Sequence, residues 1–86
     1  MDQTKYAFII KAPGYRRNTH KAHMKSPAFD AKFIGVDDFD EALAAIEDLT
    51  GAGTQVVELC GGFSAQEATK LRRRFPDCEI GRVTYP

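Results

Sequence analysis

The chain has 86 residues, of which 43% are apolar and 28% charged, and these values are typical of a single globular domain over residues 1–86. Twelve basic and twelve acidic residues give a formal net charge of zero, which argues against a nucleic-acid-binding protein. The sequence has no apolar run of the ~20 residues that a membrane-spanning helix needs, and its N-terminus lacks a signal-peptide pattern. A cytoplasmic protein with two reduced cysteines and no disulfide is therefore expected.

Strands and helices are predicted to alternate along the chain. Apolar or alternating runs predict strands, and amphipathic runs with capping residues predict helices. The predicted strands cover residues 6–10, 31–36, 56–60 and 79–85, and the predicted helices cover residues 19–25, 39–49 and 65–74. The helix over residues 19–25 has the weakest pattern, with Asn18 or Thr19 as its cap and Pro27 as its end.

This order of elements predicts an α/β fold with parallel strands and right-handed crossovers. Strands 6–10 and 56–60 are the most apolar and are expected at the centre of the sheet. The expected fold is a small doubly wound, flavodoxin-like, parallel sheet of four strands in the order 2-1-3-4, with three helices. One face of this sheet would be thinly covered, so a homo-oligomer, most simply a dimer, is expected.

The junction between strand 56–60 and the last helix carries the most specific motif. Ser64 and Glu67 have the spacing of a capping box, in which each side chain satisfies a free backbone N–H of the first helical turn. Gly61 and Gly62 precede this helix, so their amides and the helix dipole could hold a phosphate or carboxylate. The alternative is a tight turn that needs positive φ, which glycine adopts readily.

In a sheet of the expected order, the loop after the first strand would face this glycine turn. Both follow the carboxyl ends of strands one and three, at the switch point where α/β sheets bind ligands. The predicted ligand-binding residues are Pro13, Gly14, Tyr15, Arg16, Arg17, His20, Gly61, Gly62 and Ser64. An anionic small molecule is the expected ligand, and no cofactor, nucleic acid or membrane is expected as a partner.

Cys60 and Glu58 are the candidate catalytic residues. A helix N-terminus and basic side chains favour the thiolate of Cys60, which is the nucleophilic form. The alternative for Cys60 is a small buried residue that ends a core strand. Glu58 could act as a general base, or it could form a structural pair with Lys11 or an arginine.

His20 and His23 are three residues apart and could share one face of the helix predicted over residues 19–25. Together with Cys60 or Glu58 they could bind zinc. Two ligand-type residues at this spacing are a weak pattern, so no metal is predicted. Surface histidines, or one histidine in the pocket, are the expected outcome.

Several short strings of this chain resemble those of a family of small bacterial proteins. They are Lys5–Ile10, Pro13–Tyr15, His20–Lys21, Ile34–Val36 and Val57–Phe63, and the Glu-Leu-Cys-Gly-Gly-Phe string is the most specific. The family is catalogued only as a domain of unknown function. The resemblance therefore implies a compact α/β domain and supplies no activity. Arg16 and Arg17 depart from the family pattern, in which an acid and a proline are expected.

Two functions are open at this point. The first is a small-molecule (anionic metabolite) binding domain or small enzyme, with its pocket at the C-terminal ends of strands one and three. The second is a non-catalytic oligomeric or partner-binding module. Nucleic-acid binding through Arg72, Arg73 and Arg74 is disfavoured, because no aromatic stacking platform accompanies these arginines.

Overall fold

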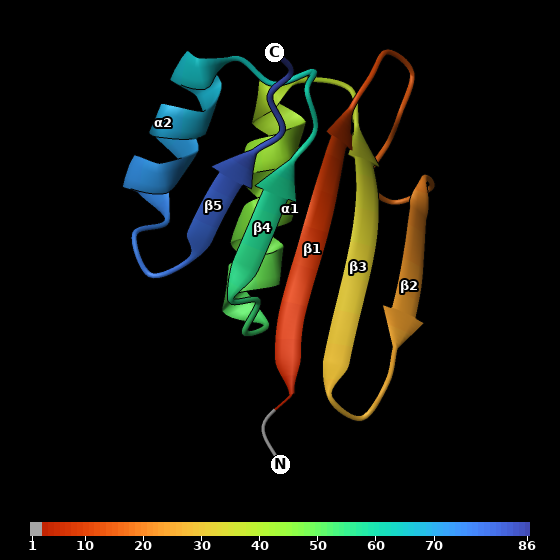
Figure 1. Ribbon diagram of the computed structural model, residues 1–86. Coiled ribbons are helices and arrows are strands. Elements are labelled where there is room, and N and C mark those ends of the chain that lie inside the picture. The colour runs from red at the N-terminus through yellow and green to blue at the C-terminus, as the bar shows by residue number, and fades with distance from the viewer. Residues whose placement is uncertain (1–2) are drawn as a thin grey trace.

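The computed structural model describes residues 3–86, which form a five-stranded sheet with two helices packed on one of its faces (Figure 1). The elements are β1 (Thr4–Lys11), β2 (Lys21–Lys25), β3 (Phe29–Val36), α1 (Phe39–Gly51), β4 (Val56–Leu59), α2 (Ala65–Arg74) and β5 (Glu79–Arg82). α1 connects β3 to β4, and α2 connects β4 to β5. Both connections run in the same direction across the sheet. Right-handed crossovers therefore place both helices on the same face.

The sheet has the strand order β2-β3-β1-β4-β5. β1 pairs in parallel with β3 and β4, and β4 pairs in parallel with β5, whereas β2 runs antiparallel to β3. The predicted fold class is therefore wrong. The protein is α/β, but its sheet is mixed and five-stranded with two helices, instead of parallel and four-stranded with three.

The error lies in residues 19–25, which were expected to form a helix and contain β2 instead. β2 pairs with β3 from Lys21 opposite Ile34 to Lys25 opposite Asp30. Ser26 closes the hairpin, because its backbone N–H donates to the carbonyl of Phe29 and its hydroxyl accepts from the Phe29 N–H. Main-chain pairing along the whole of β2 outweighs a weak local helix preference.

Both remaining helices begin where the capping residues predict. The side chain of Asp38 accepts a hydrogen bond from the Glu41 N–H at the start of α1. Ser64 and Glu67 form the complete capping box at the start of α2, which confirms that prediction. A helix long and apolar enough to cross a membrane is absent from residues 3–86.

The hydrophobic core lies between the helices and one face of the sheet. Ala7 and Ile9 of β1 and Val57 and Leu59 of β4 are fully buried there. They pack in one cluster with buried side chains of both helices, including Ile46 and Leu71, and with Phe63. The alternate residues of the same strands point to the opposite face, because successive strand side chains alternate. In the described residues no helix covers that second face (Figure 1).

Candidate functional site

The loop between β1 and β2 packs against the end of β3. The Tyr15 ring lies so close to Gly35 that a Cβ on Gly35 would come within 2.5 Å of it. The same ring stacks on His20, with 5.0 Å between the ring centroids. Gly14 has φ of +86°, and its N–H donates to the Asp37 carboxylate over 2.9 Å; Pro13 is exposed beside it. This loop is therefore built onto β3, on the side of β1 away from β4.

The arginines of this loop are paired with acids at and along α1. Arg16 lies 3.3 Å from a carboxylate oxygen of Asp37, and Arg17 lies 2.7 Å from one of Asp48. The basic stretch over residues 11–25 and the acidic stretch over residues 37–48 thus partly neutralise each other. The structure directs Arg16 and Arg17 toward α1 and not toward the glycine turn after β4.

The glycine turn is occupied by contacts within the protein. The Cys60 Sγ accepts hydrogen bonds from the backbone N–H of Lys11, over 3.2 Å, and of Gly62, over 3.3 Å. The Ser64 N–H donates to the Glu67 carboxylate over 2.8 Å. Positive φ is found only at Gly14 and Gly53 in the described residues, so the turn does not use it. Gly62 is instead required by close approach, because a Cβ there would lie 2.7 Å from the Lys11 carbonyl oxygen.

Lys11 and Glu67 join the end of β1 to the start of α2. The Lys11 Nζ lies 2.9 Å from both carboxylate oxygens of Glu67 and 5.3 Å from the centroid of the Phe63 ring. Burial raises the pKa of Glu67, but hydrogen bonds from Lys11 and Ser64 and the Lys11 charge together outweigh it and lower this pKa below its ordinary value. Lys11 was one of the predicted partners of Glu58, but the structure pairs Lys11 with Glu67.

Replacing Glu67 with glutamine is expected to lower the free energy of unfolding by about 2 kcal/mol at pH 7, the order of a hydrogen bond to a charged group. Because the pKa of Glu67 is lowered by folding, its contribution is present at neutral pH and is lost as the pH falls through the folded-state value. Urea unfolding between pH 7 and pH 3 should show the difference from wild type shrinking below the ordinary glutamate pKa of 4.5. Asp40→Asn, at an exposed site in the first turn of α1, is the control. A pH-independent deficit in Glu67→Gln would contradict the prediction.

Glu58 and Cys60 have different neighbours. Glu58 is exposed on the uncovered face of the sheet, where it is paired in register with Phe8 of β1. The pKa of Tyr6 is raised chiefly by burial. The hydrogen bond with Glu58 and the negative charge of Glu58 raise it further. Cys60 is partly buried against the core, and its thiol lies at the end of β1. The second cysteine, Cys78, is free and buried, and this burial together with Glu79 raises the pKa of its thiol.

His20 and His23 have different partners. The His20 Nδ1 accepts from the Arg16 N–H over 2.9 Å. His23 pairs with Asp30, a buried carboxylate of β3 whose pKa is lowered chiefly by the hydrogen bond with His23. Asp30 was not among the predicted site residues, because the predicted strand began at residue 31 whereas β3 begins at Phe29. The alternation of Lys21, His23 and Lys25 with Ala22 and Met24 is a period-two signal that would have indicated the partner strand.

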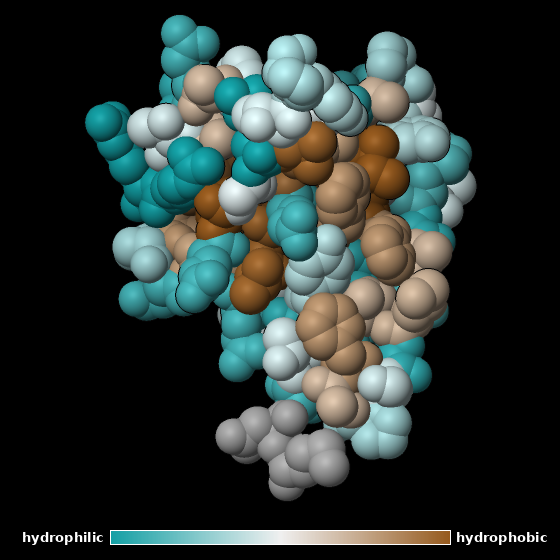
Figure 2. Space-filling view, in the orientation of Figure 1, coloured by the Kyte–Doolittle hydropathy of each residue, from teal (hydrophilic) through white to brown (hydrophobic). Residues whose placement is uncertain are grey.

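The uncovered face of the sheet carries apolar side chains that are partly exposed to solvent. Figure 2 shows apolar residues gathered over the strands on this face. We call this side of the sheet the apolar face. The strand registers assign to it the residues Tyr6, Phe8, Ile10, Ala22, Met24, Phe29, Ala31, Phe33 and Val56. Phe29 is 45% exposed and Met24 is 65% exposed, and Tyr6 packs on Phe29 with 5.6 Å between ring centroids.

Comparison with known proteins identifies a family but no characterised relative. Residues 4–86 match a family described as a family of unknown function (DUF6506). No curated protein and no solved structure matches the chain. The match covers nearly the whole sequence, including every strand and helix described above.

Proposed function

Because the chain belongs to the family of unknown function DUF6506, whose description supplies no activity, we propose a function from its geometry: the protein is a self-associating α/β module. Two copies pair through the apolar face to make a homodimer. The observation that carries this proposal is that one side of a mainly apolar sheet has no covering element among residues 3–86. Contiguous exposed apolar patches of this kind are typical of interaction surfaces.

The size of the apolar face supports a stable interface. The five strands have four to eight residues each. At about 3.3 Å per residue and about 4.8 Å between strands, they cover roughly 450 Å² in projection. Protruding aromatic side chains increase the accessible area beyond this projection. A standard protein interface buries about 800 Å² on each partner. A second sheet packed face to face therefore provides an occupant of the right dimensions.

The distribution of charge is compatible with a second copy of the same chain. Glu58 of β4 and Glu79 of β5 lie toward one edge of the face. At the opposite edge, β2 contributes Ala22 and Met24 to this face, because its lysines point to the helix side. A two-fold axis along the central strand β1 would place β5 of one protomer over β2 of its partner, so that the two acidic edges stay apart in an isologous interface.

Sedimentation velocity at micromolar concentration tests the proposal. Wild type is expected to sediment at twice the mass of the chain. Phe33→Glu places a charge opposite Phe8 near the middle of the apolar face and should yield a folded monomer, because burying an unpaired charge at an interface is costly. Phe29→Glu is a second variant that the free monomer tolerates more easily, since Phe29 is 45% exposed.

Tyr85→Glu is the matched control, because it adds the same charge at an aromatic residue that is 79% exposed and lies after β5. It should leave the dimer intact. A monomeric wild type up to high concentration, or dimers that survive both phenylalanine substitutions, would refute the proposal. We also place this module in the cytoplasm, where Cys60 and Cys78 would stay reduced.

A further inference from the structure

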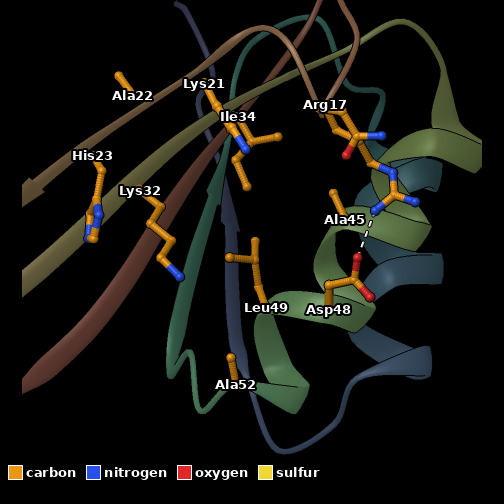
Figure 3. Close-up of a pocket in the computed structure, with 11 residues that line it drawn as sticks. Arg17, Lys21, Ala22, His23, Lys32, Ile34, Ala45, Asp48, Leu49 and Ala52 are labelled. Carbon is orange, nitrogen blue, oxygen red and sulfur yellow. Dashed lines mark hydrogen bonds and ion pairs between the residues drawn. The ribbon is translucent and has the colours of Figure 1, made fainter.

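A groove of about 510 Å³ lies on the helix side of the sheet, between β2, β3 and α1 (Figure 3). It exists because α1 packs over β1 and β3, and in the described residues no helix covers β2 on this side. It is separate from the glycine turn and opens away from the apolar face. The antiparallel strand β2, which sequence analysis did not predict, supplies one wall.

The floor of the groove is apolar. Ile34 of β3 faces Ala45, Leu49 and Ala52 at and beyond α1 across the space between strand and helix. Binding pockets for small organic molecules have volumes of about 300–1,000 Å³, with a mainly apolar lining and a few polar groups that set the orientation. This floor fits the aliphatic or aromatic body of a small ligand.

The rim of the groove is cationic. Three of its lining side chains are basic, Arg17, Lys21 and Lys32, and one is acidic, Asp48. Arg17 is paired with Asp48 over 2.7 Å, and the lining residue His23 is paired with Asp30. Within residues 3–86 no ion pair engages Lys21 or Lys32. Lys32 extends from the strand toward Leu49, and Lys21 lies beside Ile34 (Figure 3).

We propose that this groove binds a small organic acid, whose carboxylate pairs with Lys21 and Lys32 while its apolar body lies on Ile34 and Leu49. The ammonium groups of Lys21 and Lys32, neither of which is in an ion pair within residues 3–86, supply the charge. The apolar floor selects an acid with a hydrocarbon body over a fully polar anion. Charge-assisted hydrogen bonds to a carboxylate fix its orientation. The site is independent of the proposed dimer, because the groove and the apolar face lie on opposite sides of the sheet.

Nitrogen-15 NMR titration with 4-phenylbutyrate at low ionic strength tests this proposal, with 4-phenylbutanamide as the neutral probe of the same shape. The carboxylate is expected to shift the amide signals of residues 21–23, 32–34 and 45–52. The neutral probe, 4-phenylbutanamide, should bind at least about tenfold more weakly, because it lacks the charge that Lys21 and Lys32 recognise. Added salt should weaken the binding of 4-phenylbutyrate and leave the binding of 4-phenylbutanamide unchanged.

The double variant Lys21→Gln/Lys32→Gln should bind 4-phenylbutyrate about tenfold more weakly than wild type. Lys25→Gln/Lys70→Gln is the matched control, because it removes the same charge from residues outside the groove lining and should bind like wild type. Matched amide spectra will establish that each variant is folded. Equal binding of acid and amide, equal loss in both double variants, shifts confined to the apolar face, or no shifts at all would each overturn the proposal.

Discussion

Replacing Phe63 with alanine is expected to lower the free energy of unfolding by about 3–5 kcal/mol, the range for deleting a buried aromatic side chain. Phe63 is 1% exposed and belongs to the core cluster between sheet and helices. Small domains have a total stability of about 5–15 kcal/mol, so this loss is expected to remove a large part of the stability of the domain.

The position of Phe63 explains why the loss should be at the upper end of this range. The residue precedes the N-cap Ser64, and Ala68 occupies the fourth position of α2, so the two buried side chains hold the positions of a hydrophobic staple. Its ring also lies under the Lys11 ammonium, 5.3 Å from Nζ to the ring centroid. This one side chain thus connects the end of β1 with the start of α2.

Urea unfolding of Phe63→Ala and wild type, at one protein concentration, measures this effect. Tyr85→Ala is the control, because it truncates an aromatic ring that is 79% exposed near the same end of the sheet. A change of about 0.5 kcal/mol or less is expected for the control. Similar midpoints for both variants would show that Phe63 does not anchor the core.

Local signals in the sequence predicted those elements that local interactions stabilise. The capping pairs Asp38 with Glu41 and Ser64 with Glu67 correctly located the starts of both helices. The continuous apolar run of β1 indicated a central strand, and β1 does lie at the centre of the sheet. Each of these features depends on residues within one turn or one strand, so the sequence alone contains the needed information.

β2 could not be predicted in the same way, because its structure depends on a distant partner. Its alternation of basic and apolar residues is the one local sign of a strand, and its residues are exposed throughout, so their stability comes from main-chain pairing with β3. The groove beside it was missed for the same reason. Lys21 and Lys32 are eleven positions apart in the chain, and they line the same groove only because β2 folds back along β3.

The candidate site at the strand ends illustrates a second limit. The expected topology placed Arg16 and Arg17 opposite the glycine turn, but the acids that bind them lie on and beside α1. Choosing among several acidic partners requires distances that a sequence does not contain. Likewise, the two glycines of the turn suggested positive φ. In the structure Gly62 is needed because a side chain there would collide with the backbone of another strand, at Lys11.

That steric reason predicts very different effects at two adjacent glycines. A Cβ on Gly62 would lie 2.7 Å from the Lys11 carbonyl oxygen and 3.3 Å from the Cys60 Sγ, and the backbone of a central strand cannot move away cheaply. Gly62→Ala is expected to lower the free energy of unfolding by about 2–3 kcal/mol, as for overpacking in a well-packed interior.

Gly61→Ala is the matched control, because the same methyl group would meet only the ring of Tyr85, 2.8 Å away. That ring is 79% exposed near the end of the chain and can rotate aside. Gly61 has no positive φ, so alanine should fit its backbone, and reduced freedom of the unfolded chain offsets any small strain. Urea unfolding of the two variants should therefore differ by about 2 kcal/mol or more.

Thermal unfolding with phosphate or sulfate then distinguishes packing from ligand binding at this turn. If close approach to Lys11 is the reason for Gly62, these anions should stabilise wild type and Gly61→Ala equally, since the Gly62 N–H is already bonded to Cys60. A selective stabilisation of wild type that Gly62→Ala abolishes would assign an anion to the turn. Equal stability losses for Gly61→Ala and Gly62→Ala would contradict the steric argument, because only one of the two substitutions meets backbone of another strand.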